Sequence, residues 1–287
     1  MPRFAPVKLL AAAALLAAPL IVASTPAEAQ RTRVARVNPE LAAAVADPRR
    51  NEDRARDRWR KPAETLAFFQ VEPGMKVGEY APGGGWYSRL LGMYLGPRGK
   101  LVGLYFNPNV GPFDDKTKEG IVAGAAKFPA DVAGWSGQPA ERFAGYSLGS
   151  IPEGEKGTFD RILIMRMVHN MHRFGMAYDN LTRMRDLLKP GGMIGVEQHR
   201  AKPGTPYEYA GGSKGYMTEK DVIALFEAHG FELAGKSELN ANRADPANWP
   251  DGVWTLPPVL AKKDVDRAKY EAIGESDRMT LLFRKRP

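Results

Sequence analysis

Short apolar runs alternate with segments of helical periodicity along most of the chain, and this alternation limits the possible folds most strongly. Runs that indicate buried strands lie at 75–80, 100–106, 159–165, 193–199 and 279–284. Stripes of apolar residues at helical spacing lie between them, at 86–95, 116–127, 178–188 and 218–229. Strands that alternate with helices predict a parallel sheet, and right-handed crossovers place helices on both of its faces. We therefore expect a doubly wound α/β fold.

Three consecutive glycines follow the first expected strand. In the stretch VGEYAPGGGWYS (77–88), the strand ends just after Glu79, and Gly83, Gly84 and Gly85 lead into a helix. Glycine allows positive φ and close approach of a ligand to the backbone, and a helix start presents free amides. Ligands of such sheets bind beyond the carboxyl ends of the strands. The stretch predicts a ligand-binding loop, although a tight structural turn would use the same residues.

The first thirty residues have the pattern of a secretory signal peptide. A positively charged start precedes an apolar run from 9 to 23, and the small-x-small stretch 27–29 forms a cleavage site. The apolar run is shorter than the ~20 residues that a membrane-spanning helix needs, and Pro19 interrupts it. We expect cleavage after Ala29, a periplasmic or secreted protein, and no stable membrane span after cleavage.

Composition excludes several other classes of protein. The chain of 287 residues is 44% hydrophobic, which is enough for a large core, and it has a formal net charge of +8. It has no cysteine, so disulfides and thiolate metal sites are excluded. The densest basic stretch, 49–61, is diluted by Glu52, Asp53 and Asp57 and indicates a solvated helix face. We expect no nucleic-acid partner.

The order of these segments resembles that of class I S-adenosylmethionine-dependent methyltransferases, over roughly 62–239 and the final strand. Glu79 takes the acidic position at the end of the family's first strand. Ala81, Gly83 and Gly85 stand at the three glycines of its Gly-x-Gly-x-Gly motif.

Two further stretches carry the resemblance. FDRILIMRMVHN (159–170) is similar to the family's fourth strand and the loop after it, and LLKPGGMIGVEQHR (187–200) is similar to the turn and fifth strand. The chain looks most like a group of bacterial predicted methyltransferases that often carry export signals. That closer likeness lies in PGGGWY (82–87), HNMH (169–172), LPP (256–258) and SDRM (276–279).

The resemblance implies a Rossmann-like sheet with an antiparallel last strand, S-adenosylmethionine as cofactor, and methyl transfer to an unidentified small-molecule acceptor. It divides the chain into a signal peptide (1–29), a helical lead-in (30–61) and a methyltransferase-like domain (62–287) with a loop insertion near 241–278. The alternative is an exported binding protein of the same fold that has lost methyl transfer. No oligomeric state follows from the sequence.

Three positions depart from the family pattern. Ala81 replaces the first glycine, and alanine does not adopt positive φ easily. Tyr105, with Asn107 just beyond it, stands where a carboxylate usually accepts from the ribose hydroxyls, and Ser147 stands where an acidic residue often lies near the adenine. These departures predict weak cofactor binding or favour the binding-protein alternative. The residues that we assign to the cofactor are Glu79, Tyr80, Ala81, Gly83, Gly84, Gly85, Tyr105, Asn107, Ser147 and Arg166.

Polar residues follow the fourth and fifth strands, where the family faces its acceptor. His169 and Asn170 follow the fourth strand, and Glu197 and His199 end the fifth. Neighbouring strand ends share one edge of the sheet, so these four residues are our candidates for catalysis. A base among them is needed only if the acceptor loses a proton.

Structural roles remain alternatives for the same residues. His169 can bond a backbone carbonyl, and Glu197 can pair with Arg166 or Arg200. The stretch 276–278 either folds back over the cleft or forms a plain surface turn. The histidines meet no known metal-ligand spacing, so we expect no metal site.

Overall fold

The structure is a computed structural model that describes Met1 and residues 36–287. The expected signal peptide and its cleavage site lie outside the described residues, apart from Met1. Among the described residues, no helix combines the length and the apolar character that crossing a membrane requires.

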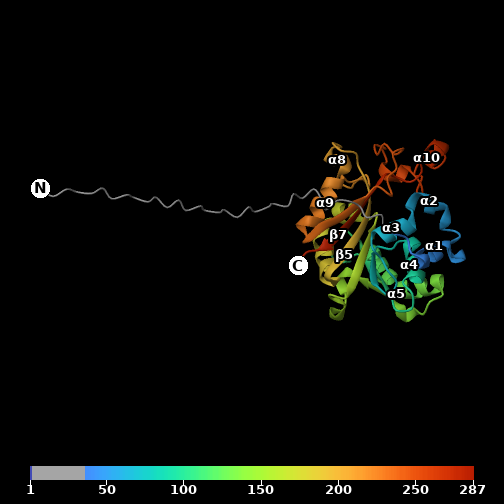
Figure 1. Ribbon diagram of the computed structural model, residues 1–287. Helices are drawn as coiled ribbons and strands as arrows, with labels where there is room; N and C mark the ends of the chain where they lie inside the picture. Colours follow the sequence, from blue (N-terminus) through green and yellow to red (C-terminus); the bar gives the residue numbers. More distant parts are fainter. Residues whose placement is uncertain (2–35) are drawn as a thin grey trace. The chain divides into compact units, whose positions relative to one another are not determined.

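A single mixed sheet in the order β3-β2-β1-β4-β5-β7-β6 forms the centre of the fold (Figure 1). The five strands β1 to β5 are parallel, and β7 runs antiparallel to both β5 and β6. The doubly wound sheet with an antiparallel last strand is confirmed. The strands are β1 (Lys76–Tyr80), β2 (Lys100–Tyr105), β3 (Phe143–Ser147), β4 (Phe159–Met165), β5 (Leu188–His199), β6 (Phe231–Ser237) and β7 (Arg278–Lys285).

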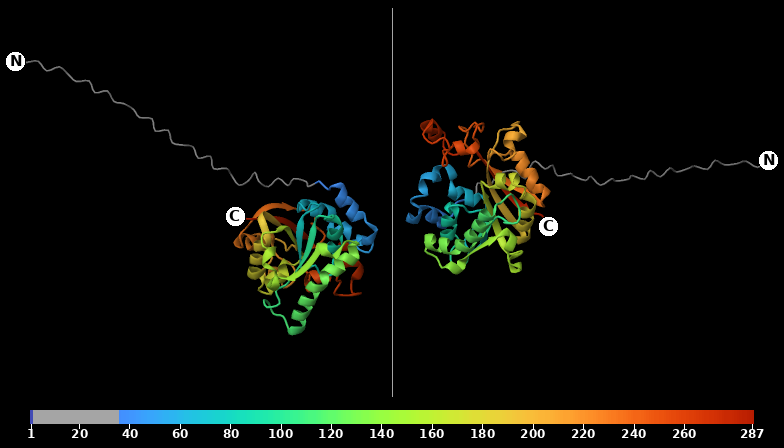
Figure 2. Two further views of the ribbon diagram at one scale, coloured as in Figure 1. Left: turned by 90° about the horizontal axis from the view of Figure 1, so that it is seen from below. Right: turned by 180° about the vertical axis from the view of Figure 1, so that it is seen from behind.

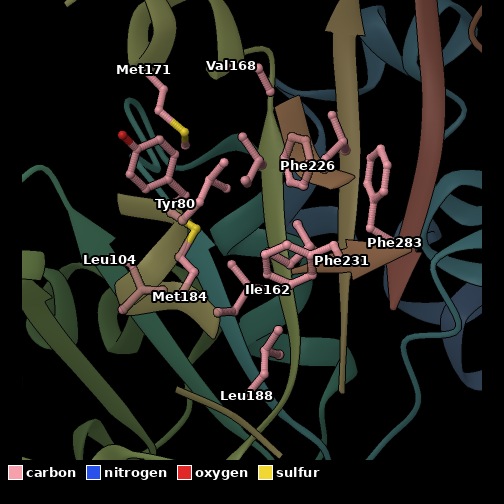
Figure 3. Packing of buried hydrophobic residues seen from close by; sticks show 14 of the residues in the cluster. Tyr80, Leu104, Ile162, Val168, Met171, Met184, Leu188, Phe226, Phe231 and Phe283 are labelled. Atoms are coloured by element: carbon pink, nitrogen blue, oxygen red, sulfur yellow. The ribbon is translucent and has the colours of Figure 1, made fainter. Parts of the chain in front are cut away.

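Alternate residues of the strands face opposite sides of the sheet, as the two-residue period of a strand requires. On β1, Val77 packs into one apolar cluster and Tyr80 into the other; on β4, Leu163 and Ile164 divide in the same way. Figure 3 shows part of the cluster that contains Tyr80, with Ile162 of β4 beside it. Both faces of the sheet are therefore buried, which explains the nearly continuous apolar runs of the sequence.

Helices cover both clusters. One cluster receives side chains from α1, α3, α4 and α5, and the other from α6, α7 and α9. The helices are α1 (Pro39–Ala46), α2 (Asp57–Arg60), α3 (Pro62–Phe68), α4 (Trp86–Tyr94), α5 (Asp115–Ser136), α6 (Val168–Arg173), α7 (Ala177–Leu187), α8 (Tyr207–Ala210), α9 (Glu219–Ala228) and α10 (Arg267–Ile273).

Helix α5 is longer than the sequence indicated, and Figure 2 shows it beside the sheet. The expected helix ended near residue 127, whereas α5 continues through Pro129 to Ser136. Phe128 and Val132 are buried on the face of α5 that packs on the sheet. Burial of these two side chains offsets the hydrogen bond that proline removes, at ~1.5–3 kcal/mol for each fully buried large apolar side chain.

The stretch 241–258 is ordered around one buried carboxylate, Asp245. It accepts hydrogen bonds from Tyr216 Oη, Trp249 Nε1 and the backbone N–H of Asp277, each at 2.9 Å. A small apolar cluster that includes Leu256 packs around it. The segment 241–258 contains no strand and only one short 3₁₀ turn. Charge-assisted hydrogen bonds to Asp245 therefore hold it in place. This insertion (orange to red) meets the lead-in (blue) near α2 and α10 in Figure 1.

Candidate active site

A cavity of about 420 Å³ lies at the carboxyl ends of β1, β4 and β5. The sheet order reverses between β1 and β4, so the cavity occupies the switch point where open α/β sheets bind ligands. The strand ends contribute Tyr80, Met165 and His199. The glycine loop, the lead-in and the insertion complete the wall, with Gly83, Gly84, Trp86, Tyr87, Arg56, Arg60, Val253, Trp254, Leu256 and Ser276 among their residues.

The loop between β1 and α4 has three residues with positive φ. Ala81, Gly83 and Gly85 have φ angles of 48°, 58° and 75°. Ala81 therefore keeps the conformation of the glycine that it replaces, although an L-residue there is strained by ~1–2 kcal/mol. Its N–H donates to the carbonyl of Leu104 at 2.8 Å, which ties this conformation to β2. The loop lines the cavity from Ala81 to Gly84.

Glu79 is a buried carboxyl group at the edge of the cavity. Its Oε2 accepts a 2.6 Å hydrogen bond from Ser88 Oγ on α4. Burial raises the pKa of Glu79 to about 7, against the smaller opposing effects of Ser88 and the nearby arginines. The group thus titrates near neutral pH, in a wall that it shares with the glycine loop.

His169 and His199 lie close together in the cavity wall, with ring centroids 5.6 Å apart. Burial lowers the pKa of His169 to about 4 and holds the pKa of His199 well below its usual value. Both imidazoles are therefore neutral at neutral pH and each has a nitrogen that can accept a proton. His169 Nδ1 lies 3.4 Å from Gln198 Oε1 and not on the backbone carbonyl of the structural alternative, and His199 Nδ1 lies 2.6 Å from Ser276 Oγ.

Glu197 is held in ion pairs behind the wall. Its Oε2 is 3.2 Å from Arg166 Nη1, and its Oε1 is 2.9 Å from Arg278 Nη1. Glu197 is fully buried and is not among the residues that line the cavity. The pairing with Arg166 is one of the two structural alternatives; Arg200 instead pairs with carboxylates that include Glu238.

Asn170 lies beside His169 at the start of α6 and lines the cavity. Its Nδ2 is 3.5 Å from Met167 Sδ, whereas its Oδ1 is buried and has no partner among the described residues. An amide oxygen in this state can accept a hydrogen bond from a ligand.

The structure does not bring the three expected nucleoside contacts to the cavity. The ring of Tyr105 packs edge-on against Phe128 of α5, at 6.3 Å between centroids. Asn107 Nδ2 donates to Asp179 at 3.2 Å, and the hydroxyl of Ser147 bonds that of Ser150 at 2.8 Å. None of these three predicted residues lines the cavity.

Several residues of the cavity wall were not predicted from the sequence, because they come from outside the strand–helix repeat. Arg60 belongs to the lead-in, and Trp254 belongs to the insertion, where its ring lies 6.1 Å from that of His169. Ser276 folds back into the wall, as one of the two interpretations of the stretch 276–278 expected. A tryptophan in a loop rich in proline was the one sequence signal for Trp254. Arg60 had none, because the basic stretch around it indicates solvent exposure.

The residues described in the structure include no group of three or more His, Cys, Asp or Glu side chains placed to hold a metal ion.

Solved structures provide the informative comparison. The sequence matches no protein-family model and no curated protein. A SAM dependent methyltransferase from Aquifex aeolicus superposes with a TM-score of 0.50 at 15% identity, over 87% of this chain and 100% of that one. The chain has the Rossmann-like methyltransferase fold.

Two other solved structures are similar. A putative sarcosine dimethylglycine methyltransferase from Galdieria sulphuraria has a TM-score of 0.48 at 16% identity, over 90% of this chain and 94% of that one. A geranyl diphosphate methyltransferase, in complex with SAM, has a TM-score of 0.49 at 13% identity, over 85% of this chain and 94% of that one.

Proposed function

We propose that this protein binds S-adenosylmethionine in the cavity and transfers a methyl group to a small-molecule acceptor. The observation that supports this most directly is the loop from Ala81 to Gly85, which keeps three positive φ angles and borders a cavity at the switch point. A Cβ built at Gly84 meets no atom within 4 Å, so this side of the cavity has room for a ligand against the backbone. Glu79 adds a carboxyl group beside it.

The two sides of the cavity differ in chemistry, and this difference supports a division of roles. Glu79 and the glycine loop are polar and would hold the methionine part of the cofactor. Trp254 and Leu256 form an apolar wall near His169 and His199, which suits an acceptor. Bound S-adenosylmethionine supplies an electrophilic methyl group, and the protein contributes mainly position.

The histidines would act on the acceptor rather than on the cofactor. If the acceptor nucleophile carries a proton, a neutral imidazole of His169 or His199 can take it as the new bond forms. Ser276 fixes the ring of His199 through the contact at Nδ1. When Nδ1–H donates to Ser276 Oγ, Nε2 is the nitrogen that accepts the proton. Asn170 Oδ1 can orient a donor on the acceptor.

One observation favours the alternative function, a binding protein without methyl transfer. Tyr105, Asn107 and Ser147 form contacts within the protein, so the usual ribose and adenine partners are not supplied by these side chains. A charged hydrogen bond contributes ~1.5–3 kcal/mol, and each ~1.4 kcal/mol is tenfold in affinity. Loose binding of the cofactor follows under either function.

Export is part of the proposal, because residues 1–29 have the pattern of a signal peptide. The mature chain would begin at Gln30 in the periplasm or outside the cell, and its acceptor would be a small molecule present there. Mass analysis of the protein recovered from the periplasmic fraction tests this. An intact Met1 terminus on soluble cytosolic protein would contradict it.

Turnover separates the two functions. The mature protein is incubated with S-adenosylmethionine and a low-molecular-weight extract, and S-adenosylhomocysteine is measured by mass spectrometry. A His199→Asn variant is expected to lower the rate by ~10²–10⁴-fold without loss of cofactor binding. His172→Asn is the matched control, because His172 lies on α6 outside the cavity wall. Cofactor binding without any turnover would favour the binding protein.

A further inference from the structure

Positive charge exceeds negative charge in the ion-pair network beneath the cavity. The guanidinium groups of Arg56, Arg60 and Arg278 share the carboxylate of Glu275, at 2.7–3.1 Å. Glu197 is shared by Arg278 and a fourth arginine, Arg166. Four arginines thus surround two carboxylates.

Both carboxylates are buried and lie in ion pairs with arginines. Glu275 is buried, and although burial alone would raise its pKa, Arg60 and Arg278 hold that pKa at about 2. Glu197 Oε2 accepts a hydrogen bond from Arg166, whereas Oε1 lies 2.9 Å from Arg278 Nη1 in an ion pair without hydrogen-bond geometry. The cavity wall also contains the acidic residues Glu79, Glu52 and Asp53, of which Asp53 pairs with Arg89.

Among the described residues, only Nε of the Arg60 guanidinium has a hydrogen-bond partner. Its plane lies over the ring of Trp86, with Cζ 4.8 Å from the centroid, and its Nε bonds both oxygens of Glu275. No bond from Nη1 or Nη2 to a described residue is present. Arg60 is 2% exposed yet lines the cavity. Burial and the charge of Arg166 lower its pKa to about 9.

Tyr87 and Arg166 provide further donors in the same wall. The hydroxyl of Tyr87 is buried and has no hydrogen-bond partner among the described residues, which is costly for a polar group. The side chain of Arg166 bonds Glu197 through Nη1 alone. Both residues line the cavity with Arg60. Three donor groups with spare hydrogens therefore line the same cavity.

We propose that Arg60, Arg166 and Tyr87 bind a carboxylate group of a ligand in this cavity. The inference rests on the proposed function, since the group belongs either to the acceptor, which would then be a carboxylic acid, or to the amino-acid part of the cofactor. A carboxylate matches the planar fork of a guanidinium and accepts from a phenol at the same time.

The test compares two ligands that differ in this group. S-adenosylhomocysteine carries the carboxylate, and 5′-methylthioadenosine lacks the amino-acid part. Each is titrated calorimetrically onto the mature wild type, Arg60→Gln and Tyr87→Phe, with Arg58→Gln as control because Arg58 lies on α2 outside the wall. Tyr87→Phe removes only an unpartnered hydroxyl, so its fold is expected to survive even if Arg60→Gln unfolds.

The ligand that carries the carboxylate determines which variants lose affinity for which ligand. If the carboxylate belongs to the cofactor, Tyr87→Phe lowers the affinity for S-adenosylhomocysteine about tenfold and leaves the affinity for 5′-methylthioadenosine unchanged. If it is the acceptor's, both nucleosides bind all variants equally, and benzoate or acetate stabilises the wild type and Arg58→Gln against heat but not Tyr87→Phe.

Failure of this inference is distinguishable from failure of the proposed function. Thermal stabilisation by benzoate and acetate is measured with and without nucleoside. It therefore reports on the carboxylate site even if neither nucleoside binds. The inference is overturned if Tyr87→Phe and folded Arg60→Gln match the wild type with both nucleosides and with both carboxylates.

Discussion

The indole of Trp135 occupies the space into which a side chain on Gly85 would project. A Cβ built at Gly85 lies 2.4 Å from Cζ3 of Trp135, and the φ of Gly85 is 75°. Gly84, the preceding residue, has no atom within 4 Å of such a Cβ. The adjacent glycines therefore have different roles: Gly85 is required for packing and Gly84 is open to a ligand.

Substitutions at Gly85 and Gly84 are therefore expected to have different effects. Gly85→Ala is expected to lower the free energy of unfolding by ~1–3 kcal/mol, through overpacking against Trp135 and strain at positive φ. Gly84→Val is expected to leave the melting temperature nearly unchanged and to weaken S-adenosylhomocysteine at least tenfold. Thermal unfolding and calorimetry measure the two effects. If Gly84→Val binds like the wild type, the loop is only a turn.

Ala81→Gly is expected to have little cost or a small gain in stability. The substitution relieves ~1–2 kcal/mol of strain at φ 48°, which offsets the ~0.4–1 kcal/mol that extra freedom gives the unfolded chain. Ala43→Gly, on the exposed side of α1, serves as the control and should cost ~1 kcal/mol. Equal destabilisation of the two variants in urea would argue against strain at Ala81.

Glu79→Gln is expected to stabilise the protein more at pH 8 than at pH 5. Between its usual pKa of 4.5 and its folded pKa of about 7, the folded carboxyl keeps a proton that the unfolded chain has lost. The free energy of unfolding of the wild type therefore falls as pH rises through this window, by an amount on the order of 2 kcal/mol. Urea titrations at the two pH values measure this, and a difference independent of pH would contradict it.

Tyr105→Phe is expected to leave both stability and cofactor affinity unchanged, because the ring keeps its contact with Phe128 and the hydroxyl lies outside the cavity. Tyr105→Asp is expected to destabilise the protein, since it removes the contact between the Tyr105 ring on β2 and Phe128 on α5. A loss of S-adenosylhomocysteine affinity in Tyr105→Phe, seen by calorimetry, would show that the hydroxyl contacts the ligand.

The sequence predicted the central sheet because its strands are buried on both faces. β1, β4 and most of β5 are apolar runs for that reason, and the antiparallel β7 pairs along nearly the whole of its length with β5. β6 was not predicted. It is an edge strand whose residues 231–237 mix polar, small and apolar types, because only β7 pairs with it. An edge strand carries a weaker pattern than a central one.

The candidate site was predictable only where it follows the strand–helix repeat. Glu79, the glycine loop, His169 and His199 lie at strand ends, and the cavity brings them together. Arg60 reaches the wall only because α2 is held against Glu275, a residue 215 positions further along the chain. No local pattern encodes such a contact.

Calorimetric titration of residues 30–287 with S-adenosylhomocysteine decides whether the cavity binds the cofactor. We expect saturable binding at one site per chain, weak enough to need micromolar to millimolar ligand. We expect this binding to be lost in Gly84→Val with an unchanged melting temperature. Absence of binding at millimolar ligand to folded wild-type protein would contradict the assignment of this cavity to the cofactor.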